Sequence, residues 1–191
     1  MELFFRRITD VALLSCVIAW AITSNSPMPL LIIAATIIHE TGHAITAFLI
    51  GNRFKNLSTQ ASGLKLCGNA PYTSYKAEVF TALGGPLFNF LSAWVCSTFC
   101  NSSSAIFFSA TSLALGALNL LPIKDFDGGR ITECALSLFC PYSLVTVICD
   151  LLSFFSLFFL WSMGVYLMMR SGESVTLFIF SASLFAKIFL K

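Results

Sequence analysis

The stretch Ile37-Ile-His-Glu-Thr-Gly-His-Ala-Ile-Thr-Ala-Phe48 decides how the rest of the chain is interpreted. It contains the only two histidines of the protein, His39 and His43, four residues apart in an apolar run. On a helix, residues four apart project from one face, so both imidazoles can reach one zinc ion. Glu40 lies beside them and can activate a water molecule bound to the metal. Ionisable groups in an apolar helix are costly and most often serve a function.

The composition places this helix in a membrane. Of the 191 residues, 57% are hydrophobic and only 10% are charged, whereas soluble domains carry roughly 25% charged residues. So few charges cannot cover a water-facing surface of this size. The net charge of +2 and the absence of a basic stripe also exclude nucleic acid as a partner.

The apolar segments are long enough to cross a bilayer several times, since about 20 apolar residues span its hydrocarbon core as a helix. Six spans are expected, at residues 8–24, 28–50, 78–100, 104–123, 143–169 and 174–190. The predicted fold class is therefore an all-α polytopic membrane protein of about six transmembrane helices. Residues 56–71 suggest a small re-entrant or hairpin segment after the second span, whose exposed strand edge could bind an extended peptide.

The basic residues predict the orientation, because Lys and Arg are in excess in short cytoplasmic loops. With six spans, one side of the membrane holds Arg6, Arg7, Arg53, Lys55, Lys65, Lys76, Lys124, Arg130, Lys187 and Lys191. Only Arg170 lies on the opposite side. Both termini and the opening of the active site are therefore expected to face the cytoplasm.

A catalytic zinc needs a third protein ligand, and no third histidine exists. Asp125 and Asp127 follow Pro122, which breaks a helix and lets the chain turn back. A turn at Gly128-Gly129 would swing the Asp127 carboxylate onto the metal. Asp127 is therefore favoured as the third ligand, while Asp125 and Asp150 remain alternatives.

Three segments resemble a known family. They are His39-Glu-Thr-Gly-His-Ala-Ile-Thr-Ala47, Gly84-Gly-Pro-Leu-Phe-Asn89 and Leu118-Asn-Leu-Leu-Pro-Ile-Lys-Asp-Phe-Asp-Gly-Gly-Arg130. Their order and residues are similar to those of the site-2 proteases, which are intramembrane zinc metalloproteases. The similarity is greatest to the compact bacterial branch related to the sporulation factor-processing protease. Lys124-Asp125-Phe126 differs from the more apolar stretch that the family has at this place, so Asp125 remains an alternative zinc ligand.

The resemblance implies a role for each matching residue. It implies three zinc ligands, His39, His43 and Asp127, with Glu40 as the general base. Asn119 and Asn89 would bind substrate, Asn119 by holding the peptide or the developing oxyanion. Thr41 stands where the family has Leu and is expected to point away from the metal.

The resemblance also implies the function, which is zinc-dependent hydrolysis of peptide bonds in membrane-embedded substrate helices, or regulated intramembrane proteolysis. Residues 1–191 would form a single catalytic core without a PDZ or other appended domain. The protein would be a multi-pass protein of a bacterial cell membrane. Its partners would be the lipid bilayer, a transmembrane or membrane-associated protein substrate and a regulatory membrane protein.

Two other functions use the same residues. A catalytically inactive relative could bind membrane helices as an adaptor, although such a protein would not need Glu40. A metal-ion transporter would more often show repeated halves and several acidic sites within the membrane, and no internal repeat is visible here.

Overall fold

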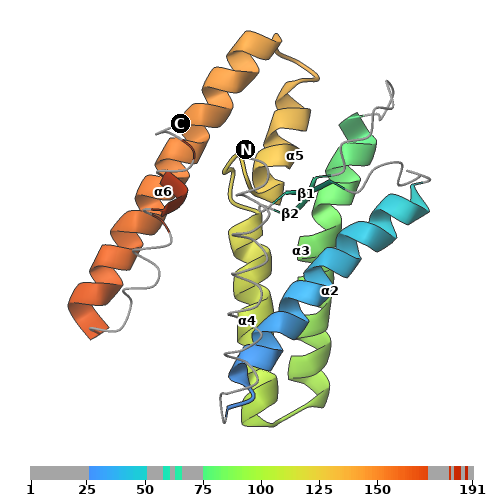
Figure 1. Ribbon diagram of the computed structural model, residues 1–191, viewed down its shortest axis with the longest axis vertical. Coiled ribbons are helices and arrows are strands. Elements are labelled where there is room, and N and C mark those ends of the chain that lie inside the picture. Colours follow the sequence, from blue (N-terminus) through green and yellow to red (C-terminus); the bar gives the residue numbers. More distant parts are fainter. Residues whose placement is uncertain are drawn as a thin grey trace. The chain divides into compact units, whose positions relative to one another are not determined.

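A computed structural model describes residues 26–50, 58–60, 63–65, 75–171, 181, 183–185 and 188. The chain forms two compact units, residues 1–119 and 120–191. The first unit contains α2 (Met28–Leu49), β1 (Ser58–Gln60), β2 (Gly63–Lys65), α3 (Tyr75–Phe99) and α4 (Ser103–Asn119) (Figure 1). The second contains α5 (Asp127–Leu136) and α6 (Tyr142–Ser171).

Three of the described helices are long and apolar enough to cross a membrane: Met28–Leu49, Tyr75–Phe99 and Tyr142–Arg170. They confirm the spans predicted at 28–50, 78–100 and 143–169 to within three residues. The span predicted at 8–24 lies outside the described residues. Of the span at 174–190, the structure describes residues 181, 183–185 and 188, which are helical. The protein is an all-α polytopic membrane protein with a small hairpin, as predicted.

The fourth span is shorter than predicted, because α4 ends at Asn119 and not at residue 123. Its 17 residues make a helix about 26 Å long. Pro122 disfavours helical geometry at Leu121. The chain instead folds into a tight loop, in which the Ile123 amide donates to the Leu121 carbonyl at 2.7 Å.

Helices α2, α3 and α4 pack against one another, and α2 crosses α3 in Figure 1. At the crossing, a Cβ atom on Gly42 would lie 2.5 Å from the Gly84 carbonyl oxygen. A Cβ atom on Gly84 would lie 2.6 Å from the Gly42 carbonyl oxygen. The two backbones therefore touch, which is the close approach that small residues allow between membrane helices.

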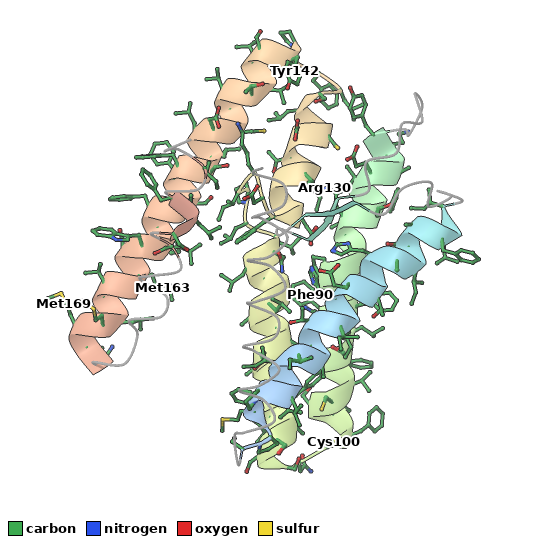
Figure 2. All side chains as sticks on the ribbon, viewed as in Figure 1. Phe90, Cys100, Arg130, Tyr142, Met163 and Met169 are labelled. Atoms are coloured by element: carbon green, nitrogen blue, oxygen red, sulfur yellow. The ribbon has the colours of Figure 1, made fainter. Side chains whose placement is uncertain are left out.

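The contact between α3 and α4 combines an aromatic ring with a polar pair. The ring of Phe90, labelled in Figure 2, fills the space beside Gly116, where a Cβ atom would lie 2.8 Å from it. The hydroxyl oxygens of Ser92 and Ser112 lie 3.0 Å apart across the interface. Small and hydroxyl side chains hold these helices together in the way expected inside a bilayer.

The hairpin predicted between the second and third spans is confirmed. Strands β1 and β2 pair antiparallel, with Ser58 opposite Lys65 and Gln60 opposite Gly63.

The second unit departs from the prediction at Gly128-Gly129, where we expected a turn. Both glycines lie in the first turn of α5, a helix that the sequence did not predict. A Cβ atom on Gly128 would collide with the Leu120 carbonyl, and one on Gly129 with the Ile123 carbonyl. The glycines are therefore needed for close packing of the helix on the preceding loop and not for turn geometry.

Helix α6 spans Tyr142–Ser171, and the labels of Tyr142 and Met169 lie near its two ends in Figure 2. Its large apolar side chains include Phe155, Phe158 and Phe159, which are 63%, 56% and 65% exposed. Such exposure suits a helix that faces lipid and would be unfavourable in water.

Candidate metal centre

The two histidines of α2 converge on one point. The Nε2 atoms of His39 and His43 lie 3.2 Å apart, and the ring planes are nearly perpendicular, at 87°. Two nitrogen ligands of a tetrahedral zinc, with bonds of roughly 2.0–2.1 Å, lie about 3.3 Å apart. The pair therefore has the separation of two ligands that share one ion.

The contacts of Nδ1, the second ring nitrogen of His43, indicate which nitrogen carries the proton. His43 Nδ1 lies 2.8 Å from the Thr81 carbonyl oxygen of α3. A carbonyl only accepts hydrogen bonds, so Nδ1 carries the proton and Nε2 keeps its lone pair. The Gly85 amide also donates toward Nδ1 at 3.3 Å, a contact that would need an unprotonated Nδ1, but this amide can donate instead to the Thr81 carbonyl of its own helix. We assign the proton to Nδ1 because the contact with the carbonyl is the shorter of the two.

The other nitrogen of His39 faces Asn89, which is fully buried in α3. The Asn89 Nδ2 atom lies 3.2 Å from His39 Nδ1, and Asn89 Oδ1 has no hydrogen-bond partner among the described residues. The two ends of an amide are distinguished only by such contacts. When the Asn89 amide is rotated by 180°, so that its oxygen and nitrogen exchange places, Asn89 Oδ1 accepts a hydrogen bond from His39 Nδ1. Both histidines then direct the lone pair of Nε2 toward a metal. A ligating histidine commonly has such a partner on its other nitrogen.

One face of α3 completes this arrangement. Thr81, Gly85 and Asn89 follow at intervals of four residues and therefore line the same side of the helix. A Cβ atom on Gly85 would collide with His43 Nε2 and would lie 2.7 Å from His39 Cε1. Gly85 thus leaves the space in which the imidazoles meet. Sequence reasoning did not find the roles of Thr81 and Gly85, although the four-residue spacing to Asn89 was visible.

Glu40 is half-buried on α2 and follows His39 in the chain, and its role as the base stays a prediction. Thr41 is exposed, and its hydroxyl donates to the Ile37 carbonyl of its own helix at 2.9 Å. It points away from the imidazoles, as expected.

The carboxylates of the second unit occupy different settings. Asp127 is buried as the first residue of α5, directly after Phe126 in extended conformation. Asp125 is half-buried in the loop before α5. Asp150 forms an ion pair with Lys124. This pairing explains why the apolar helix α6 contains a carboxylate, and it does not require a metal. The assignment of Asp127 as the third ligand stays a prediction.

Asn119 is the last residue of α4, in the first unit. Its Nδ2 donates to the Leu115 carbonyl of the same helix at 3.0 Å. An amide nitrogen has two hydrogens, so one remains for a substrate, and this role also stays a prediction.

A comparison with protein families decides the class of the protein. The Peptidase M50B-like family model matches residues 11–183. The chain belongs to this family. Membership confirms the resemblance to site-2 proteases and makes the protein an intramembrane metalloprotease by class.

A solved structure agrees with the fold of this M50B-like peptidase. The site-2 protease from Methanocaldococcus jannaschii superposes with a TM-score of 0.59 at 23% sequence identity. The superposition covers 93% of this chain and 85% of that chain. No curated protein sequence matches the chain.

Proposed function

We propose that the protein is a zinc metalloendopeptidase that hydrolyses peptide bonds in membrane-embedded substrate helices. The observation that carries this proposal is the His39–His43 pair, whose Nε2 atoms lie 3.2 Å apart. The contact of His43 Nδ1 with a carbonyl, at 2.8 Å, directs the His43 lone pair to the shared point.

The proposed zinc ligands are His39, His43 and Asp127. When bound, zinc acidifies a water molecule and polarises the peptide carbonyl. Asp127 matches the aspartate of the family's third motif, whereas the alternative Asp150 has Lys124 as an ion-pair partner, which supports Asp127 over Asp150. A carboxylate also completes the oxygen and nitrogen donor set that catalytic zinc prefers.

Glu40 is the proposed general base. It accepts a proton from the attacking water and returns it to the amine that leaves, a pair of steps that one positioned carboxylate can perform. Asn119 is proposed to hold the substrate through its second amide hydrogen. Asn89 is fully buried against His39, which supports a role in orienting that imidazole.

The substrate is proposed to be a transmembrane or membrane-associated protein, entering as an extended peptide. Peptide bonds in an intact helix are already hydrogen-bonded, so a substrate helix must unwind locally before cleavage. The β1–β2 hairpin offers a strand edge to which the unwound segment could pair. The basic residues favour an active site that opens toward the cytoplasm of a bacterial cell.

Co-expression with tagged single-span proteins tests the proposal. A cleavage product should form with the wild-type protein and be absent with Glu40→Gln, while zinc remains bound at about one ion per chain. Glu78→Gln, which removes a carboxylate from the first turn of α3, serves as the matched control and should cleave normally. His39→Ala should lose zinc.

The alternative function, a membrane-helix adaptor without catalysis, predicts a different result. Substrate would then bind equally well to the wild-type and Glu40→Gln proteins, and neither would release a product.

A further inference from the structure

The loop between α4 and α5 is attached to α6 by a buried serine. Ser153 is fully buried, and its Oγ accepts a hydrogen bond from the Lys124 backbone amide at 3.0 Å. The same hydroxyl donates to the Cys149 carbonyl of its own helix at 2.7 Å. Ser153 therefore supplies the acceptor for the Lys124 amide and ties the loop to α6.

A second contact lies one turn away on the same face of α6. Asp150 precedes Ser153 by three residues and pairs with the Lys124 side chain. Lys124 is thus held at both its backbone and its ammonium group. The side chain of its neighbour Ile123 is fully buried.

The same loop residues also support the first turn of α5. The Phe126 amide donates to the Ile123 carbonyl at 2.8 Å. Gly129 packs so closely on this carbonyl that a Cβ atom there would collide with it. The Ile123–Lys124 segment therefore connects α6 on one side to the turn that begins with Asp127 on the other.

We propose that Ser153 and Asp150 are positioning residues for Asp127, acting through the Ile123–Lys124 segment. This inference rests on the proposed role of Asp127 as a zinc ligand. A ligand on a short helix after a loop needs support, because misplacing a metal ligand by a fraction of an ångström weakens binding. Ser162 provides a contrast on the same helix. Its hydroxyl donates to the Phe158 carbonyl as that of Ser153 donates to the Cys149 carbonyl, but among the described residues no loop amide donates to it.

Zinc affinity measured by chelator competition on the purified full chain tests the inference. Ser153→Ala should lower the affinity about tenfold, the effect typical of residues that orient metal ligands. Asp150→Asn should lower it less, because the ion pair is partly exposed. Ser162→Ala is the matched control and should bind zinc like the wild type. Circular dichroism verifies that each variant keeps its helical content.

A double-mutant cycle separates positioning from general stability. In an Asp127→Ala background, Ser153→Ala should cause no further loss of zinc affinity, since its effect passes through Asp127. Equal losses in both backgrounds would overturn the inference, as would an unchanged affinity in Ser153→Ala. If Asp127→Ala itself leaves zinc affinity unchanged, the ligand assignment in the proposed function fails, and the inference that rests on it fails with it.

Discussion

The histidine pair and the aspartate proposed to join it are held in place by different means. His39 and His43 lie on a long helix whose backbone touches α3 at Gly42 and Gly84. Asp127 begins a ten-residue helix that packs on a loop, and side chains of α6 bind that loop. Contact between two helix backbones cannot relax without separating the helices, whereas a loop can move at the cost of hydrogen bonds worth about 1 kcal/mol each. The histidines should therefore be rigid and the aspartate adjustable.

The largest expected effect is on the free energy of unfolding when one methyl group is added in either region. It tests whether the histidine region is more rigid than the aspartate region. Gly42→Ala places a Cβ atom against the Gly84 carbonyl, and Gly128→Ala places one against the Leu120 carbonyl. Because two packed helices must separate, Gly42→Ala should lower the free energy of unfolding by about 3 kcal/mol. Gly128→Ala also meets backbone atoms, but they belong to a loop that can shift, so it should cost less, about 2 kcal/mol. Unfolding in mixed detergent micelles measures both, and equal losses would contradict the comparison.

The second expected effect separates metal binding from stability within the first unit. Gly85→Ala places a methyl group against both imidazoles, so the rings must move apart and zinc affinity should fall at least tenfold. Gly116→Ala meets the ring of Phe90 instead and serves as the control. It should lower the unfolding temperature while zinc affinity stays at the wild-type value. Normal zinc binding in Gly85→Ala would show that the imidazoles are less confined than the structure indicates.

The third expected effect concerns the partner of His39. Asn89→Leu has a similar volume but no acceptor for Nδ1–H, and zinc affinity should fall between tenfold and a hundredfold. Asn89→Asp supplies an acceptor in every orientation and should bind zinc far better than Asn89→Leu. Isothermal titration of the metal measures both variants. If the two bind zinc equally weakly, Asn89 contributes its volume and not its hydrogen bond.

The region around His39 and His43 could be predicted from the sequence better than the region around Asp127, for physical reasons. Apolar runs of bilayer length determine α2, α3 and α6, and the spacing of His39 and His43 places both rings on one face. Helix α5 was missed because Gly128-Gly129 is typical of turns, and the need for close packing on the Leu120 carbonyl is visible only in three dimensions. The role of Ser153 depends on a loop amide 29 residues earlier in the chain, to which no local pattern points.

The contact of Thr81 with His43 could not be predicted from the sequence, because it does not depend on the type of side chain. The smallest expected effect, that of Thr81→Val, follows from this. His43 binds the main-chain carbonyl of Thr81, and every residue type has one. The Thr81 hydroxyl instead donates to the Ala77 carbonyl of its own helix at 2.8 Å. Thr81→Val keeps the shape and the carbonyl, so zinc affinity should change by less than about twofold and the free energy of unfolding by about 1 kcal/mol or less. Chelator competition and unfolding in micelles measure the two quantities. A large loss of zinc affinity in Thr81→Val would mean that the histidines depend on a side chain as the aspartate does, and the contrast between a rigid and an adjustable region would no longer hold.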